Sequence, residues 1–172
     1  MSSQPPSPTI TILGIDPGTR ITGYGLIRVD GSHFEPLDFG CIRPNPSLEL
    51  PQKYLMLFNA IELLLDQFQP QFVAVETQFV DKNVQSALKL GMARGVILLA
   101  AAKRGIPIHE YTPRKAKLSV VGNGSASKQQ VQKMIQLLLK LPILPQPEDA
   151  ADALALAICH AHSRKTKDFS YV

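Results

Sequence analysis

The order of strand-like and helix-like segments is the feature that most limits the folds open to this chain. Three segments rich in β-branched residues come first, at 9–16, 22–29 and 33–42, separated by the turn-forming pairs Pro17-Gly18 and Asp30-Gly31. Strands that follow one another through such short turns pair antiparallel. The first part of the sequence is therefore predicted to form a three-stranded meander.

After the meander the hydrophobic period changes to steps of three and four residues, which indicates helices lying on a sheet. The further elements expected are a helix at 54–68, a strand at 72–76, a helix at 83–103, a strand at 106–111, and helices at 127–140 and 147–164. The predicted order is β-β-β-α-β-α-β-α-α. This order predicts an α/β fold in which helices flank a mixed five-stranded sheet.

The length of 172 residues suits one domain, expected at residues 9–164 between a disordered tail at 1–8 and a flexible tail at 165–172. No apolar run approaches 18 residues, and the first residues lack the pattern of a secretory signal, so no membrane span or export is expected. Cys41 and Cys159 lie far apart and match no metal-ligand spacing. They are best interpreted as reduced thiols, which favours a cytoplasmic protein.

Four acidic side chains occupy positions from which they could meet at one point. Asp16 and Glu76 each end a predicted strand, and Asp149 and Asp152 stand three apart in the first turn of the last helix, on one side of it. If the first and fourth strands are neighbours, all four converge. Unpaired carboxylates that close together repel one another unless cations hold them.

Each acid also has an ordinary structural explanation. An aspartate before Pro-Gly, such as Asp16, commonly forms a turn, and Glu76 could serve similarly at its strand end. Asp149 and Asp152 could simply favour the helix macrodipole, as Glu148 beside them is expected to do. The four acids together, more than any one of them, therefore predict a site.

Carboxylate oxygens without other ligands suit Mg²⁺ or Mn²⁺ better than zinc. Two such ions about 4 Å apart can activate a water, stabilise an attacked phosphate and take charge from the leaving oxygen. His160 and His162 are two residues apart on a helix, face different ways and are not expected to bind metal. With four acids committed to metal, 18 basic residues face 14 − 4 = 10 acidic ones, a balance suited to binding phosphate.

Four blocks of sequence resemble the RuvC family of Holliday-junction resolvases, in the family's order and spacing. The blocks are GIDPGTRITGYGLI at 14–27, VETQFVDKNVQSALKLGMARGV at 75–96, VVGNGSASKQQVQ at 120–132 and DAADALALAICHAH at 149–162. The resemblance covers nearly the whole chain, from about Ile12 to Ser163. The GIDPG element by itself is also similar to the start of actin-like ATPases and other ribonuclease-H-like proteins.

The resemblance implies a ribonuclease-H-like fold and a homodimer that makes paired symmetric nicks in opposing strands of a four-way DNA junction, in recombination and repair. The family's four acidic positions fall on Asp16, Glu76, Asp149 and Asp152. It implies Mg²⁺, two ions per subunit, with Mn²⁺ able to substitute. It also implies a preference for a short T-rich sequence, ends that a ligase can seal, and work beside the RuvA and RuvB branch-migration proteins.

Further side chains are expected to contact DNA. Lys117 and Lys128 match positions that in similar proteins lie beside the scissile phosphate, and Arg114 belongs to the same basic cluster. A solvated basic face is the alternative. Phe79 lies in a polar segment, and in similar proteins an aromatic side chain at this position stacks on bases opened at the junction. Packing of Phe79 under its own loop is the alternative.

Small residues mark one stripe of the helix predicted at 83–103, namely Ala87, Gly91 and Gly95. They would permit close approach of another backbone. The family resemblance favours a two-fold interface with the same helix of a second subunit. The alternative is packing of this stripe on the chain's own sheet.

Three other functions are open to such a sequence. An actin-like ATPase needs two copies of the fold and a second phosphate loop, which 172 residues do not hold. An RNA-cutting nuclease of the same fold is disfavoured by the DAADALA block and the long block after Glu76. A catalytically dead junction-binding module is disfavoured by the intact acids.

Overall fold

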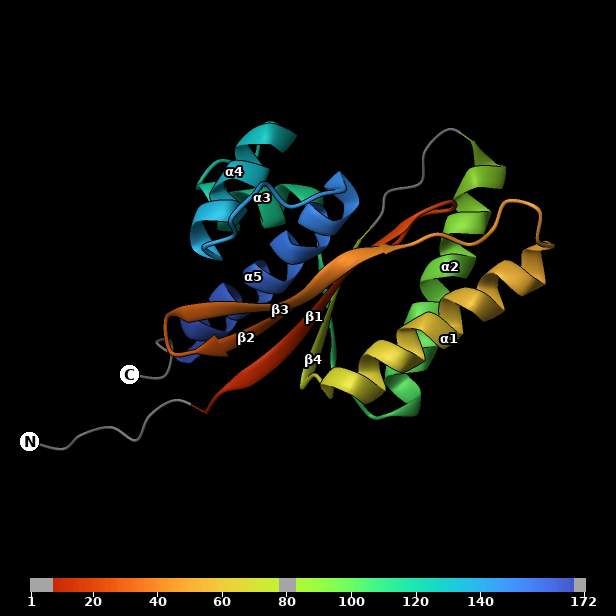
Figure 1. Cartoon of the computed structure of the whole chain (residues 1–172), viewed down its shortest axis with the longest axis horizontal. Coiled ribbons are helices and arrows are strands. Elements are labelled where there is room, and N and C mark those ends of the chain that lie inside the picture. Colours follow the sequence, from red (N-terminus) through yellow and green to blue (C-terminus); the bar gives the residue numbers. More distant parts are fainter. Residues whose placement is uncertain (1–7, 78–82, 169–172) are drawn as a thin grey trace, which may run out of the picture.

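The computed structural model describes residues 8–77 and 83–168, with residues 165–168 described by their backbone alone (Figure 1). A mixed five-stranded sheet forms its centre, in the order β3-β2-β1-β4-β5. The strands are β1 (Ile10–Asp16), β2 (Thr22–Asp30), β3 (His33–Ile42), β4 (Phe72–Glu76) and β5 (Ile108–Tyr111). The helices are α1 (Leu50–Phe68), α2 (Val84–Lys103), α3 (Pro113–Val121), α4 (Lys128–Leu138) and α5 (Glu148–Asp168).

Strand β1 lies at the centre of the sheet and joins its two halves. It pairs antiparallel with β2, which pairs antiparallel with β3, so the predicted meander is confirmed. On its other edge β1 pairs parallel with β4, with Ile15 opposite Val75. Strands β4 and β5 are also parallel. The predicted mixed sheet of five strands is therefore confirmed, and the first and fourth strands are neighbours.

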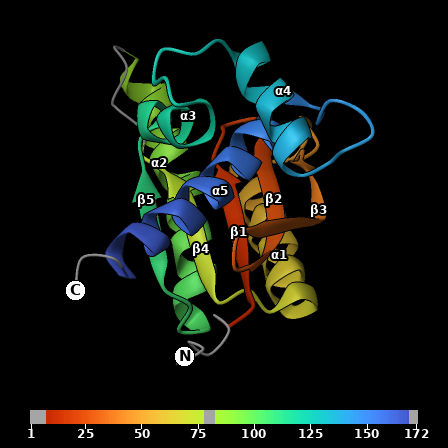
Figure 2. The ribbon, with the colours of Figure 1, turned by 90° about the vertical axis from the view of Figure 1, so that its left-hand side faces the viewer.

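Helices cover both faces of the sheet (Figures 1 and 2). Helices α1 and α2 lie on one face, and α3, α4 and α5 lie on the other. Alternate residues of β1 serve the two cores, because successive side chains of a strand point to opposite faces. Leu13 and Ile15 pack with α1 and α2, whereas Ile12 packs with α5. The same alternation directs Ala74 of β4 toward α5.

Two glycines let α5 lie directly on the sheet. A Cβ added to Gly14 of β1 would stand 2.0 Å from the carbonyl oxygen of Ala153, and one added to Gly23 of β2 would stand 2.0 Å from that of Asp149. Any larger side chain at either position would hold the helix away. The N-terminal turns of α5 are thereby brought close to β1 and β2.

Helix α3 was not predicted from the sequence, which gave only a basic segment here. It begins at Pro113 after an N-cap, since the Thr112 side chain accepts a hydrogen bond from the backbone of Lys115. It ends at Val121 and is followed by Gly122, whose φ of 79° is the left-handed conformation common after helices. Nine residues carry too few hydrophobic repeats for the helical period to stand out.

Several predicted boundaries also differ from the structure: α1, for example, begins at Leu50 and not at 54. Helix α5 continues to Asp168, so the first residues of the tail predicted at 165–172 are helical. The last strand begins at Ile108 and not at 106. The tail predicted at 1–8 lies, apart from Pro8, outside the described residues, as do residues 169–172.

By length and composition alone, α2 is apolar enough to cross a membrane, although no such span was predicted. The buried helices of compact domains have the same property. In this fold α2 packs one side against the sheet through Ala93, Ile97 and Ala100, which are almost fully buried. Its partners in that core come from β1, β4 and α1.

Candidate active site

Two carboxylates meet at the ends of the neighbouring parallel strands β1 and β4. Asp16 is the last residue of β1, and Glu76 is the last residue of β4. The pairing of Ile15 with Val75 places the two acids in register. Ile15 and Val75 point into the core under α1 and α2, so strand alternation turns the next side chains toward α5. Asp16 and Glu76 therefore face the start of α5.

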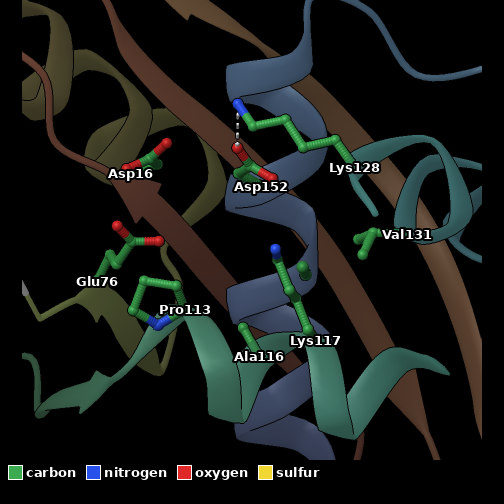
Figure 3. Close-up of a pocket in the computed structure, with 9 residues that line it drawn as sticks. Asp16, Glu76, Pro113, Ala116, Lys117, Lys128, Val131 and Asp152 are labelled. Atoms are coloured by element: carbon green, nitrogen blue, oxygen red, sulfur yellow. Dashed lines mark ion pairs between the residues drawn. The ribbon is translucent and has the colours of Figure 1, made fainter. Parts of the chain in front are cut away.

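Helix α5 brings a third carboxylate to the same place. Asp152 lines a cavity of about 260 Å³ together with Asp16 and Glu76, and Figure 3 shows the three side chains around one space. The other residues that line it are Pro113, Ala116, Lys117, Lys128, Val131 and Ala155. Asp149 lies at the edge of this site, with its backbone against Gly23 of β2.

Burial and mutual repulsion oppose ionisation of Asp16. Removal from water is the largest cause that raises the pKa of Asp16 to about 8, followed by the charges of Glu76, Asp152 and Asp149, while Lys128 lowers it. Although Asp149 does not line the cavity, its charge is thus close enough to act on Asp16. The four predicted acids form one electrostatic group.

The other two lining acids show the same behaviour. Burial and the charge of Asp152 raise the pKa of Glu76 to about 7, against the lowering effects of Lys128 and Lys117. Burial also raises the pKa of Asp152, which Lys128 counteracts. Burial thus opposes ionisation of both acids, and the two lysines partly offset it.

Lys128 is the main counter-charge within the site. Its Nζ lies 3.7 Å from Asp152 Oδ2 and 3.3 Å from Glu148 Oε2. The charge of Asp152 is the leading cause that raises the pKa of Lys128. Glu148 was interpreted only as a helix-dipole residue, so its contact with Lys128 was missed. Its position next to Asp149 was the available signal, but the partner comes from α4, which sequence spacing does not reveal.

The other residues predicted to contact DNA have different positions. Lys117 lines the cavity, and Figure 3 shows its side chain directed toward the acids. Arg114 lies outside the cavity lining, exposed, with its side chain against Gly124, where an added Cβ would stand 2.7 Å from Arg114 Cγ. Phe79 lies outside the described residues.

The donor atoms of this cavity fit a hard divalent cation by their chemistry. They are buried carboxylate oxygens, and burial followed by the neighbouring acids raises the pKa values of Asp16 and Glu76, so a bound Mg²⁺ would favour their charged forms. As the side chains stand, no three Asp, Glu, His or Cys residues in the described part of the chain are grouped closely enough to hold a metal ion. His160 and His162 contact Tyr111 and Ser119, at 2.7 and 3.0 Å.

Gly91 and Gly95 of α2 do not pack on the chain's own sheet. A Cβ added to Gly91 or Gly95 would meet nothing within 4 Å, whereas Ala87 is half-buried. The intramolecular packing considered for this stripe is therefore wrong for the two glycines. Large apolar side chains accompany them on the surface, since Leu88 is 61% exposed and Met92 is 50% exposed.

Comparison with known proteins supports the family resemblance of the sequence, both by sequence and by fold. Residues 12–160 match the family described as crossover junction endodeoxyribonuclease RuvC. The chain is 62% identical over 162 residues to the crossover junction endodeoxyribonuclease RuvC of Protochlamydia amoebophila, covering 94% of this chain and 96% of that one. It is 51% identical over 152 residues to the protein of the same name from Desulfitobacterium hafniense, covering 88% and 92%.

Solved structures agree. The structure of Thermus thermophilus RuvC in complex with a Holliday junction substrate is similar at a TM-score of 0.87 and 31% identity, covering 92% of this chain and 96% of that one. The yeast mitochondrial Holliday junction resolvase Ydc2 shares the fold at a TM-score of 0.64 and 17% identity, covering 96% and 87%.

Proposed function

The chain belongs to the RuvC family of crossover junction endodeoxyribonucleases, and on this premise we propose that it cuts Holliday junctions at the cavity between β1, β4 and α5. The observation that carries this proposal is the meeting of Asp16, Glu76 and Asp152 around one cavity, beside Lys117 and Lys128. Paired symmetric nicks in opposing strands would resolve the four-way DNA junction during recombination and repair.

We propose Asp16, Glu76, Asp149 and Asp152 as the catalytic and metal-binding residues. Mg²⁺, two ions per subunit with Mn²⁺ as a substitute, would supply water activation and stabilisation of the leaving oxygen when bound there. The raised pKa values of Asp16 and Glu76 support the assignment, because a divalent cation would relieve their repulsion. Metal binding by Asp152 would also require Lys128 to move away from this carboxylate, with which it pairs at 3.7 Å.

The lysines of the cavity are proposed to bind the DNA phosphate that is cut. Once released from its carboxylate partners, Lys128 would neutralise a phosphate oxygen, and Lys117 would approach from α3 on the same side. Arg114, exposed beside the loop at 122–127, is proposed as a more distant phosphate contact. Stacking of Phe79 on an opened base remains a proposal that concerns a residue outside the described part.

A homodimer is proposed to form through α2. The exposed Gly91 and Gly95, with the half-buried Ala87, would let the same helix of a second subunit approach closely, and Leu88 and Met92 would bury apolar surface there. A two-fold dimer presents two identical cavities to a junction whose opposing strands are related by two-fold symmetry. This arrangement would account for paired cuts.

The cellular setting is proposed from the family. The protein would act in the cytoplasm on chromosomal junctions, beside the RuvA and RuvB branch-migration proteins, and would prefer a short T-rich sequence. The free thiols of Cys41 and Cys159 are compatible with a reducing compartment.

Incubation with a synthetic mobile four-way junction and Mg²⁺ tests the function. We expect symmetric nicks from the wild-type protein and none from Asp16→Asn, which should still bind the junction. The matched control is Asp30→Asn, a loss of the same charge at the exposed end of β2. Near wild-type cleavage by Asp16→Asn would refute the carboxylate assignment, and no cleavage by the wild type would refute the function.

A further inference from the structure

A second cavity, lined by basic side chains, lies near the acid cavity and shares none of its residues. Its volume is about 300 Å³, and it is formed by the turn after β1, the segment after β3 and the first turn of α1. Its lining residues are Thr19, Arg20, Pro44, Pro46 and Lys53. Helix α1 lies on the face of the sheet opposite α3 and α4 (Figure 1), so this cavity draws on the other side of the fold from Lys117 and Lys128.

Local contacts fix the positions of the two basic residues of this cavity. A Cβ on Gly18 would stand 1.9 Å from the carbonyl oxygen of Ile21, so the turn that carries Arg20 closes tightly enough to require glycine. The Gly18 N–H also donates to the side chain of buried Thr22, at 3.5 Å. On the other wall, Lys53 Nζ donates to the carbonyl oxygen of Pro46 at 2.9 Å.

The positive charge in this cavity has no acidic partner among the described residues. Neither Arg20 nor Lys53 forms an ion pair there, whereas Arg28 and Arg104 on other surfaces do. Lys53 also lies in the first turn of α1, where the positive end of the helix disfavours a cation. The Glu49 side chain already caps the start of α1, so an anion placed in the cavity would be attracted by Arg20 and Lys53 and not by the helix end.

The distance to the acid cavity suits neighbouring phosphates of one DNA strand. Arg20 follows Asp16 by four residues, so their Cα atoms are at most about 14 Å apart. Successive phosphates of one strand rise about 3.4 Å along a duplex. The second cavity therefore lies within a few nucleotides of a phosphate held at Asp16.

We propose that Arg20 and Lys53 bind a backbone phosphate of the DNA a few nucleotides from the phosphate that is cut. The inference rests on the proposed function, since it takes the acid cavity as the cutting site. The ligand class is a phosphodiester anion, which fixes the position of the strand and carries no sequence information. Positive charge would then flank the acids on both sides, with Lys117 and Lys128 at one end and Arg20 and Lys53 at the other.

The first test is the salt dependence of junction binding by the variant Arg20→Gln/Lys53→Gln, measured by fluorescence anisotropy in the Asp16→Asn background. We expect several-fold weaker binding at low salt and a log–log salt slope less steep by about one for each phosphate that the variant no longer neutralises. Arg20→Lys/Lys53→Arg should keep the slope, because it keeps both charges. Lys140→Gln, an exposed lysine beyond the end of α4, should leave it unchanged.

The second test locates the phosphate. Single uncharged methylphosphonate linkages are placed at successive positions from the cut. We expect one linkage within about four nucleotides of the cut to weaken binding to the otherwise intact protein and to have no further effect on the Gln pair. Additive effects at every position would overturn the proposal, as would equal salt slopes for the Gln pair and its parent.

A free anion is the competing ligand, and inorganic phosphate is its probe. If phosphate raises the melting temperature of the wild type and not of the Gln pair, while both bind the junction equally, the cavity serves a free anion and the DNA proposal fails. Failure of the proposed function looks different: the wild type would then not cut the junction, whatever the salt slopes. Unchanged melting temperature of the Gln pair in buffer alone would show that its fold is intact.

Discussion

Asp16 is the acid of this site whose ionisation the fold opposes most strongly. An aspartate in an unfolded chain ionises near pH 4, whereas burial and three neighbouring acids raise the pKa of Asp16 to about 8 in the folded chain. Between these pH values the folded state binds more protons than the unfolded state. The free energy of unfolding therefore falls as pH rises through this range.

Thermal unfolding between pH 5 and pH 8 in the presence of EDTA checks this expectation. From pH 5 to pH 8 we expect the melting temperature of the wild type to fall on the order of 5 °C. The fall should be smaller for Asp16→Asn, because asparagine does not ionise in the buried site. Mg²⁺ at pH 8 should restore the melting temperature of the wild type. A melting temperature that rises with pH in EDTA would contradict the electrostatic account of the site.

Lys117 and Lys115 lie two residues apart on α3 and offer a matched comparison. Lys117 lines the acid cavity, whereas Lys115 lies over the ring of Tyr111, with its Nζ 5.1 Å from the ring centre. Lys117→Ala should lower the single-turnover cleavage rate about a hundredfold, as expected for loss of a charge beside the transition state. Lys115→Ala should change that rate less than threefold. Equal decreases would mean that the whole basic face acts by general attraction.

At the scale of elements, the contact between α5 and the sheet decides whether the acids meet. Gly14→Ala would place a methyl group 2.0 Å from the carbonyl oxygen of Ala153, so the helix must move away from β1. We expect a loss of about 3 kcal/mol in the free energy of unfolding. Cleavage should fall further than the unfolded fraction explains, because Asp152 moves with the helix. Denaturant unfolding and cleavage at a temperature where the variant is folded separate the two effects.

The sequence indicated most of the elements and the positions of the acids, for a physical reason. Asp16 and Glu76 end strongly apolar strands, and the alternation of strand side chains is local information that a sequence carries. Helix α3 was missed although Thr112, Pro113 and Gly122 mark its ends. The pairing of Lys128 with Glu148 was missed as well, because it joins separate elements twenty residues apart. Such contacts depend on how helices pack, which periodicity does not specify.

At the scale of the whole molecule, substitutions at the exposed glycines of α2 are expected to affect dimer formation without weakening the fold. Gly91→Ala/Gly95→Ala should leave the fold intact or stabilise it by about 1 kcal/mol per site, since alanine favours helix and nothing lies within 4 Å of either added methyl. The same methyl groups would hold two helices apart at a close interface. We expect sedimentation at micromolar concentration to show a shift from dimer to monomer, with single nicks replacing paired ones. An undiminished dimer would place the interface elsewhere.

The late position of α5 in the chain has a consequence for synthesis. Helix α5 is buried over most of its described length and fills the core on one face of the sheet, yet the ribosome makes it after every strand. Until it emerges, β1 and β4 present Asp16 and Glu76 without Asp149 and Asp152, beside an uncovered apolar surface. The acids of the cavity therefore come together only when the last helix has been made and has docked on the sheet.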